Sequence, residues 1–147
     1  MKIKIIAVGK LKKSPQLDLC DEYIKRMNWK VSVQEIDAPK ASTSAIEAPL
    51  ILKQIPDSAL VVAMDERGET LTSPAFAKKV EQWQRQTAEL VFLIGGADGF
   101  ADEVRKRANF LMSFGKQTWP HMLVRVMLLE QIYRAQQIIA GHPYHRA

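Results

Sequence analysis

The sequence predicts a single α/β domain with a mostly parallel sheet and helices on both of its faces. Short runs of apolar, largely β-branched residues alternate along the chain with segments whose apolar residues recur at helical spacing. Two of the runs, 58–65 and 90–94, are apolar almost throughout, as expected of strands that helices cover on both sides. The length of 147 residues, with 47% hydrophobic and 25% charged residues, fits one globular domain spanning 1–147.

The first part of the chain is predicted to hold two strands and two helices. Lys2–Gly9 (KIKIIAVG) has the composition of a buried strand, and Val31–Asp37 that of a second, shorter one. Between them lies a helix whose apolar residues follow the i, i+3, i+4, i+7 pattern. These residues are Cys20, Tyr23, Ile24 and Met27. Residues 40–55 are helix-like from Ala45 onward, and Pro49 either starts the main helix in its first turn or kinks it.

The middle of the chain contains the clearest interior strand, Ser58–Asp65 (SALVVAMD), which the polar turn Glu66–Glu69 is predicted to end. A helix should follow, with Ser73 as its N-cap and Pro74 in its first turn. Its buried face consists of Phe76, Val80 and Trp83. Leu90–Ile94 (LVFLI) is predicted to be another buried strand.

The last third is predicted to contain a short helix, a short strand and a long helix. The short helix spans about Asp102–Ala108, and the short strand Phe110–Ser113. The long helix begins near Pro120 or His121 and runs to about Ala140, where a glycine ends it. This helix is apolar over much of its circumference, which predicts more than one partner surface and hence a homodimer.

Ligands of parallel α/β sheets bind beyond the carboxyl ends of the strands, so three loops are candidate sites. These loops are Met64–Glu69, Gly95–Gly99 and Gly115–Pro120. The glycine pair Gly95–Gly96 would let backbone amides approach a ligand closely, although a plain tight turn would use the same residues. The sequence has neither the G-x-G-x-x-G pattern after its first strand nor a G-x-x-x-x-G-K-[ST] pattern, so dinucleotide binding and P-loop chemistry have no support.

The net charge of +5 is concentrated at the two ends of the chain. Residues 1–30 carry eight Lys or Arg against three acids, and residues 104–147 carry seven against one. A basic face formed by both ends would suit a nucleic-acid-binding protein, although ordinary solvated charges would give the same count. Whether Lys10, Lys12 and Lys13 contact RNA is left open.

The single cysteine, Cys20, cannot form an internal disulfide, and its apolar neighbours predict a buried thiol in a reducing compartment. No apolar run approaches the length of a membrane span, and the apolar stretch at the start is too short for a signal peptide. We therefore expect a cytoplasmic protein. The pair His142-x-x-His145 lacks a carboxylate or thiol at ligand spacing, so no metal site is predicted.

The C-terminal tail, residues 142–146, carries four chemically versatile side chains in five residues. They are His142, Tyr144, His145 and Arg146. Such side chains can recognise a base and its phosphate or move a proton, whereas many short aromatic tails only pack against the core.

The chain resembles the RlmH (YbeA) family, the ribosomal RNA pseudouridine N3-methyltransferases, along its whole length. The shared motifs are KIKIIAVGK at the start, AMDERG (63–68), LIGGADG (93–99), PHMLVRVMLLEQIYRA (120–135) and HPYHR (142–146). Where many members of the family have Pro-Glu after the glycine pair, this chain has Ala97-Asp98. The 115–119 stretch also differs from the commoner Ser/Leu-rich one.

The resemblance implies a SPOUT fold with a C-terminal trefoil knot, a homodimer, and S-adenosylmethionine as the methyl donor. The substrate it implies is N3 of a pseudouridine in 23S ribosomal RNA, presented by the assembled ribosome. Transferred residue by residue, it implies a cofactor site made of Met64, Asp65, Gly95, Gly96, Gly115, Lys116, Gln117, Thr118, Trp119 and Pro120. It also implies catalysis by the four tail side chains, with Arg125 and Arg146 contacting RNA.

The resemblance leaves two questions of mechanism open. The imide N3 of pseudouridine is protonated at neutral pH, so either a base must remove the proton or a positive environment must stabilise the anion. The sequence does not select the base among the four tail residues. Arg125 has an alternative role in a structural ion pair with an acid such as Glu130.

Two other functions also fit: a non-catalytic ribosome-binding domain, and a SPOUT methyltransferase that acts on transfer RNA.

Overall fold

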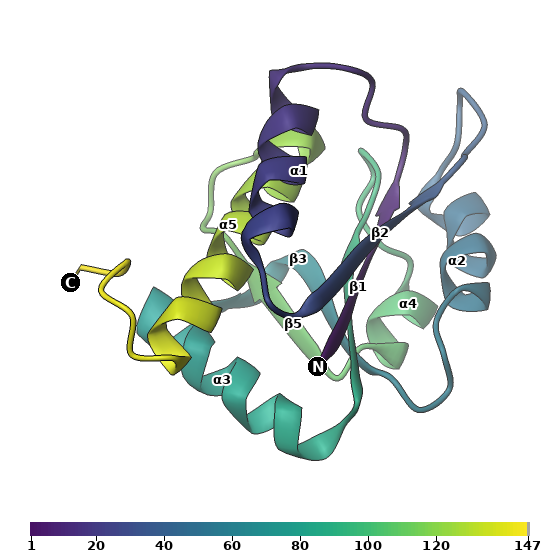
Figure 1. The fold of residues 1–147 in the computed structure, drawn as a ribbon. Helices are drawn as coiled ribbons and strands as arrows, with labels where there is room; N and C mark the ends of the chain where they lie inside the picture. The colour runs from purple at the N-terminus through teal and green to yellow at the C-terminus, as the bar shows by residue number, and fades with distance from the viewer. Residues whose placement is uncertain (147) are drawn as a thin grey trace.

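The computed structural model describes residues 1–146, in which five strands and five helices alternate (Figure 1). The strands are β1 (Lys2–Val8), β2 (Lys30–Ile36), β3 (Leu60–Thr70), β4 (Glu89–Ile94) and β5 (Phe110–Ser113). The helices are α1 (Pro15–Arg26), α2 (Ser44–Lys53), α3 (Ser73–Gln86), α4 (Asp102–Arg107) and α5 (His121–Ile139). The predicted α/β class is confirmed.

The strands form one sheet in the order β2-β1-β4-β3-β5, and each neighbouring pair runs parallel. Lys2 of β1 lies opposite Lys30 of β2 on one side and Glu89 of β4 on the other. The expectation of a mostly parallel sheet is therefore confirmed. Strand β4 occupies the centre, which explains why its sequence is apolar on both faces.

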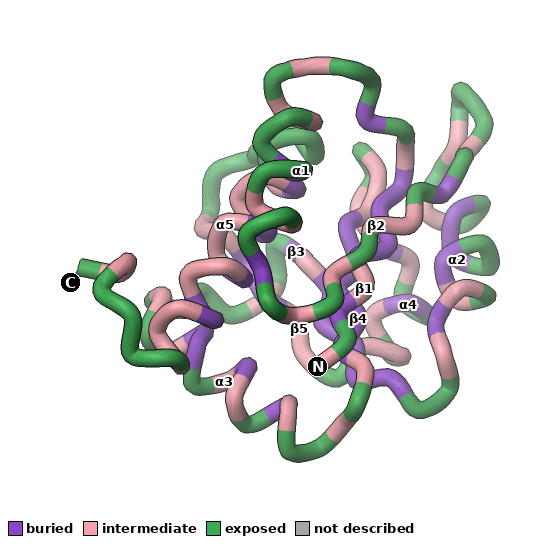
Figure 2. The backbone as a smooth tube through the Cα atoms, in the orientation of Figure 1, coloured by how far each residue is buried: buried purple, intermediate pink, exposed green. Residues whose placement is uncertain are grey.

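Helices cover both faces of the sheet (Figures 1 and 2). Helices α1, α3 and α5 pack over the face that includes Ile3 and Phe92, whereas α2 and α4 cover the face that includes Ile6 and Leu93. Phe92 is fully buried and makes an edge-to-face contact with Phe76 of α3, with 6.2 Å between the ring centroids. The predicted stripes of the first and third helices thus face a common core.

Side-chain caps set the start of three helices. Ser14 and Thr43 each accept a hydrogen bond from the amide three residues on, at the starts of α1 and α2. Thr72 caps α3 by accepting from the amide of Ala75 at 3.2 Å, so the predicted N-cap, Ser73, is in fact the first helical residue. The open boundary of α2 is settled by Thr43, and Pro49 lies inside this helix.

Strand β3 differs from its prediction at the carboxyl end. The expected turn at 66–69 belongs to the strand, because β3 continues to Thr70 after an irregularity. Both Met64 and Glu69 align with Met112 of β5, so the residues between them form an excursion from the regular ladder. Gly68 lies against the β5 backbone, where an added Cβ would be 2.5 Å from the carbonyl carbon of Leu111.

Membrane-spanning helices and clusters of metal-binding side chains are both absent from residues 1–146. In this part of the chain, no helix is both long and apolar enough to cross a membrane. The same residues include no cluster of three His, Cys, Asp or Glu side chains placed to hold a metal ion.

Candidate active site

A pocket of about 610 Å³ opens where β3, β4 and β5 end, a volume within the range of about 300–1,000 Å³ that is usual for small-molecule sites. Its apolar part comes from these strands and from the start of α5. Its polar part comes from the loops between them. The lining residues are Met64, Asp65, Glu66, Ile94, Gly95, Gly96, Ala97, Asp98, Gly99, Arg105, Met112, Ser113, Phe114, Gly115, Gln117, Thr118, Trp119, Pro120, His121 and Val124.

The pocket brings together nine of the ten residues that the resemblance assigns to the cofactor; Lys116 is not part of the lining. Sequence reasoning missed Arg105, which comes from α4, and His121 and Val124, which come from the first turn of α5. Arg105 could not be found from the strand-end rule, because that rule selects the loops that follow the strands and Arg105 lies within a helix.

The glycine loop is held by its own backbone and by its neighbours. The amide of Gly99 donates to the carbonyl of Gly96 at 3.1 Å, and the φ of +74° at Gly99 is one that other residues rarely adopt. At Gly96, an added Cβ would lie 2.8 Å from Oε2 of Glu47. Gly96 therefore lacks room for a side chain because Glu47 lies behind the loop.

Asp65 is fixed by two contacts and has little freedom to rearrange. Its Oδ2 accepts from Nε of Arg105 at 2.7 Å, and its Oδ1 accepts from the amide of Arg67 at 2.8 Å. The pocket wall at the end of β3 is thereby tied to α4. This ion pair neutralises the charge of Asp65 within the site.

Arg125 is buried and bound to another part of the chain. Its Nη1 donates to Glu35 at 2.8 Å, and its Nη2 donates to the carbonyl of Gly9 at 3.3 Å. Burial disfavours ionisation of Glu35, but the hydrogen bonds from Arg125 and the amide of Leu11 outweigh it and lower the pKa of this carboxyl. The geometry supports the structural role for Arg125, with Glu35 as its partner instead of Glu130.

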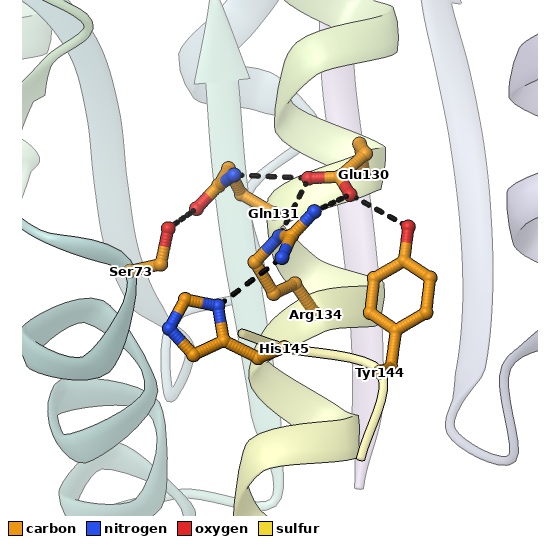
Figure 3. A network of polar contacts seen from close by, with 6 residues as sticks. All are labelled: Ser73, Glu130, Gln131, Arg134, Tyr144 and His145. Carbon is orange, nitrogen blue, oxygen red and sulfur yellow. Dashed lines mark hydrogen bonds and ion pairs between the residues drawn. The ribbon is translucent and has the colours of Figure 1, made fainter. Parts of the chain in front are cut away.

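The C-terminal tail folds back onto α5, where Glu130 is the centre of a polar network (Figure 3). Glu130 accepts from the hydroxyl of Tyr144 at 2.8 Å and from Nη2 of Arg134 at 2.9 Å. Nη1 of Arg134 lies 3.1 Å from Nδ1 of His145, and its guanidinium lies 4.8 Å from the ring centroid of Tyr144. The tail is thus held in one arrangement by an ion pair on the helix.

These contacts also define which tail groups carry protons. Burial, together with the hydrogen bond to Glu130, raises the pKa of Tyr144 to about 12, so its phenol remains protonated at neutral pH. Arginine can only donate, so Nδ1 of a neutral His145 accepts and its proton is on Nε2. Nε2 is buried and has no hydrogen-bond partner among the described residues. The hydroxyl of Tyr144 thus already donates to Glu130, whereas the Nε2–H of His145 is a donor without a partner in residues 1–146.

The other two tail residues are exposed. Nδ1 of His142 accepts from the amide of Tyr144 at 3.2 Å, and Arg146 is exposed to solvent. The structure does not bring the tail to the pocket of the same chain. Val124 lines the pocket and Arg134 holds the tail, and ten helical residues separate these positions by about 15 Å.

Comparisons with known proteins agree with this fold and show the family. A family model described as "Predicted SPOUT methyltransferase" matches residues 1–145. A protein of Rhodospirillum centenum named Ribosomal RNA large subunit methyltransferase H is 51% identical, with all of both chains covered. One of Rhodopseudomonas palustris with the same name is 46% identical, again over the whole of both chains.

A solved structure shows the same fold at low sequence identity. It is a probable methylase family protein from Haemophilus influenzae, with a TM-score of 0.57 and 13% identity. The match covers 99% of this chain and 70% of the other.

The parallel sheet, the strand-end pocket and the family model together define a methyltransferase of the SPOUT class. Within that class, the chain belongs to the RlmH family, whose members are named Ribosomal RNA large subunit methyltransferase H.

Proposed function

We propose that this protein methylates 23S ribosomal RNA at N3 of a pseudouridine, with S-adenosylmethionine as donor and the assembled ribosome as substrate. The observation that carries the proposal is the pocket at the ends of β3, β4 and β5, in a chain that matches methyltransferases of ribosomal RNA over its full length. The test is transfer of a labelled methyl group to ribosomes that lack the modification. Transfer to free transfer RNA instead would favour the alternative substrate, and no transfer to either would favour a binding domain.

The pocket suits an adenosyl cofactor. Its volume is adequate, and its floor contains apolar side chains from three strands, Met64, Ile94 and Met112. Backbone groups of the glycine loop and of 115–120 are available for polar contacts. Bound there, the cofactor would supply an electrophilic methyl group on a sulfonium sulfur. The chain's own tasks are then to bind and orient the cofactor and to prepare the accepting nitrogen.

The tail supports anion stabilisation rather than removal of the proton by a side chain. Within the described residues, His145 has an unused donor at Nε2, Tyr144 would offer its hydroxyl by exchanging Glu130 for the substrate, and Arg146 adds an exposed positive charge. Hydrogen bonds to the carbonyls that flank N3 would stabilise the deprotonated imide, whose proton would pass to solvent. We propose this as the role of the tail, with Arg146 also contacting RNA phosphate.

Because the tail lies far from the pocket of its own chain, a second copy would have to supply it. Three large apolar side chains next to the pocket are exposed: Trp119 by 38%, Met122 by 47% and Leu123 by 39%. We propose that this apolar patch, Trp119, Met122 and Leu123, forms the centre of a homodimer interface. In such a dimer the tail of each chain would complete the pocket of the other.

Cofactor binding is tested by blocking the pocket at Val124, which lines it from the first turn of α5. Val124→Trp should weaken the binding of S-adenosylmethionine at least tenfold, because the larger side chain fills space that the ligand needs. Isothermal titration calorimetry measures the affinity. The control, Ile46→Trp, alters an exposed side chain of α2 and should bind normally. Equal affinities for the two variants would place the site elsewhere.

The homodimer is tested by charging the apolar patch. Replacing both Met122 and Leu123 with Glu should halve the mass measured by light scattering at micromolar concentration, because like charges would meet at a two-fold axis. The same double change at Ile46 and Leu50, exposed apolar residues of α2, should leave the mass unchanged. A wild-type protein that is already a monomer at this concentration would contradict the proposal.

A further inference from the structure

Glu47 is a buried carboxylate that the proposed chemistry does not use. It lies on α2 with 4% of its surface exposed, among apolar residues of that helix. Its Oε2 accepts a hydrogen bond from the hydroxyl of Ser42. Its Oε1 is buried and has no hydrogen-bond partner among residues 1–146. A buried acceptor left without a partner is costly for folding, so its retention calls for an explanation.

The carboxylate of Glu47 lies behind the glycine loop, next to a residue that lines the pocket, although Glu47 is not part of the lining itself. A Cβ on Gly96 would lie 2.8 Å from Oε2 and 2.9 Å from Oε1, so both oxygens abut this residue. Gly96 itself lines the pocket. With no side chain between them, only one residue of backbone separates the carboxylate from the ligand space.

Within the described part of the chain, an ionised Glu47 would also lack a counterion, in contrast to the other buried carboxylate in this region. Asp65 is paired with Arg105 at 2.7 Å, so its field is largely neutralised. The ion pairs found among residues 1–146 do not include Glu47. The negative potential of an ionised Glu47 would extend past Gly96 into a pocket from which much of the water would be excluded when a ligand is bound.

We propose that Glu47 makes the pocket prefer the positively charged methyl donor to the neutral product. This inference rests on the proposed function. Methyl transfer breaks the bond between sulfur and the methyl carbon, and the electron pair stays on sulfur. The new bond uses the electron pair of the deprotonated N3. The sulfonium charge is thereby lost, and S-adenosylhomocysteine is a neutral thioether at this atom. The attraction from Glu47 disappears at the same moment, which favours exchange of product for fresh donor.

The experiment compares the affinities of S-adenosylmethionine and S-adenosylhomocysteine by calorimetry in the wild type and in Glu47→Gln. A single charge about 10 Å away, at an effective dielectric constant of about 20, changes affinity by about tenfold. Glu47→Gln should therefore weaken the donor about tenfold and change the affinity of the product by less than about twofold. The control Glu103→Gln removes an exposed carboxylate of α4 and should leave both affinities unchanged.

A second variant addresses the same charge without altering the buried side chain. Leu50 lies one helical turn from Glu47 and is 36% exposed, so Leu50→Arg adds a nearby cation that α2 can accommodate. This variant should reduce the preference for the donor about threefold.

The outcomes separate the two proposals. The inference would be overturned if Glu47→Gln weakened the binding of both ligands to the same extent. It would also be overturned if Leu50→Arg left the ratio of the two affinities unchanged. Either result would show that Glu47 only supports the loop. Failure of both ligands to bind the wild-type protein would instead overturn the proposed function.

Discussion

Deletion of residues 142–147 should abolish methyl transfer to ribosomes while S-adenosylmethionine binds with an affinity within about twofold of the wild type. The reason is the separation within one chain: the tail is held by Glu130 and Arg134, and the pocket lies at the other end of α5. Labelled methyl transfer and calorimetry measure the two properties independently. A truncated protein that methylates at the wild-type rate would show that the tail only packs against α5.

Single substitutions distinguish the roles within the tail. Tyr144→Phe keeps the ring but removes the donor, and His145→Ala removes the other one, so each should lower kcat by about 100-fold. Arg146→Ala should chiefly weaken the interaction with the ribosome and make its salt dependence shallower. Circular dichroism of each variant serves as the control for folding.

A mixing experiment tests whether the tail acts in the pocket of a partner. Val124→Trp chains keep the tail but lose the pocket, whereas truncated chains keep the pocket but lose the tail. Equal mixtures should recover about one quarter of wild-type activity, because half of the dimers are mixed and each has one complete site. If the two kinds of chain exchange between dimers but methyl-transfer activity does not recover, the proposal of a site shared between two chains is contradicted.

Gly68→Ala should be the most damaging single-methyl change in the sheet. The added Cβ would lie 2.5 Å from the backbone of Leu111 and Met112, and backbone atoms of a paired strand cannot move aside as a flexible side chain can. We expect a loss of about 3 kcal/mol in the free energy of unfolding, which lowers the urea midpoint by about 1–2 M.

The matched control for this change is Glu69→Ala, at the next position of β3. Glu69 is exposed, so its truncation should shift the urea midpoint only slightly. The Gly68→Ala variant should also bind cofactor more weakly, because Met64 and Asp65 of the same strand line the pocket. A midpoint equal to that of Glu69→Ala would mean that β3 and β5 can separate locally at little cost.

The sequence was sufficient to predict the elements of the fold, since alternating apolar runs and helical stripes are local signals. It did not reveal that β3 continues past Asp65, because a polar segment with a glycine has the composition of a turn. The close approach of Gly68 to β5 depends on a strand more than 40 residues away. Such long-range contacts leave no local pattern.

The parts of the site that follow the parallel strands could be predicted from the sequence, whereas the residues that helices contribute could not. The three loops were found because the carboxyl ends of neighbouring parallel strands meet at one edge. Arg105 and Glu47 come from α4 and α2 and are brought to that edge only by the packing of the helices. A glutamate within the apolar segment SAIEAPLILK was a local signal for Glu47, since buried carboxylates are rare.

The strand order has a consequence for synthesis on the ribosome. The centre of the sheet is β4, which pairs Glu89 with Lys2 and lies between β1 and β3. During translation, β1 and β2 can associate early, but β3 has no place beside them until residue 94 has left the exit tunnel. Helix α5, which packs against both α1 and α3, must come later still. A nascent chain will therefore expose the apolar faces of its first three strands for most of its synthesis, a period in which chaperones would protect it from aggregation and slow elongation would increase the risk.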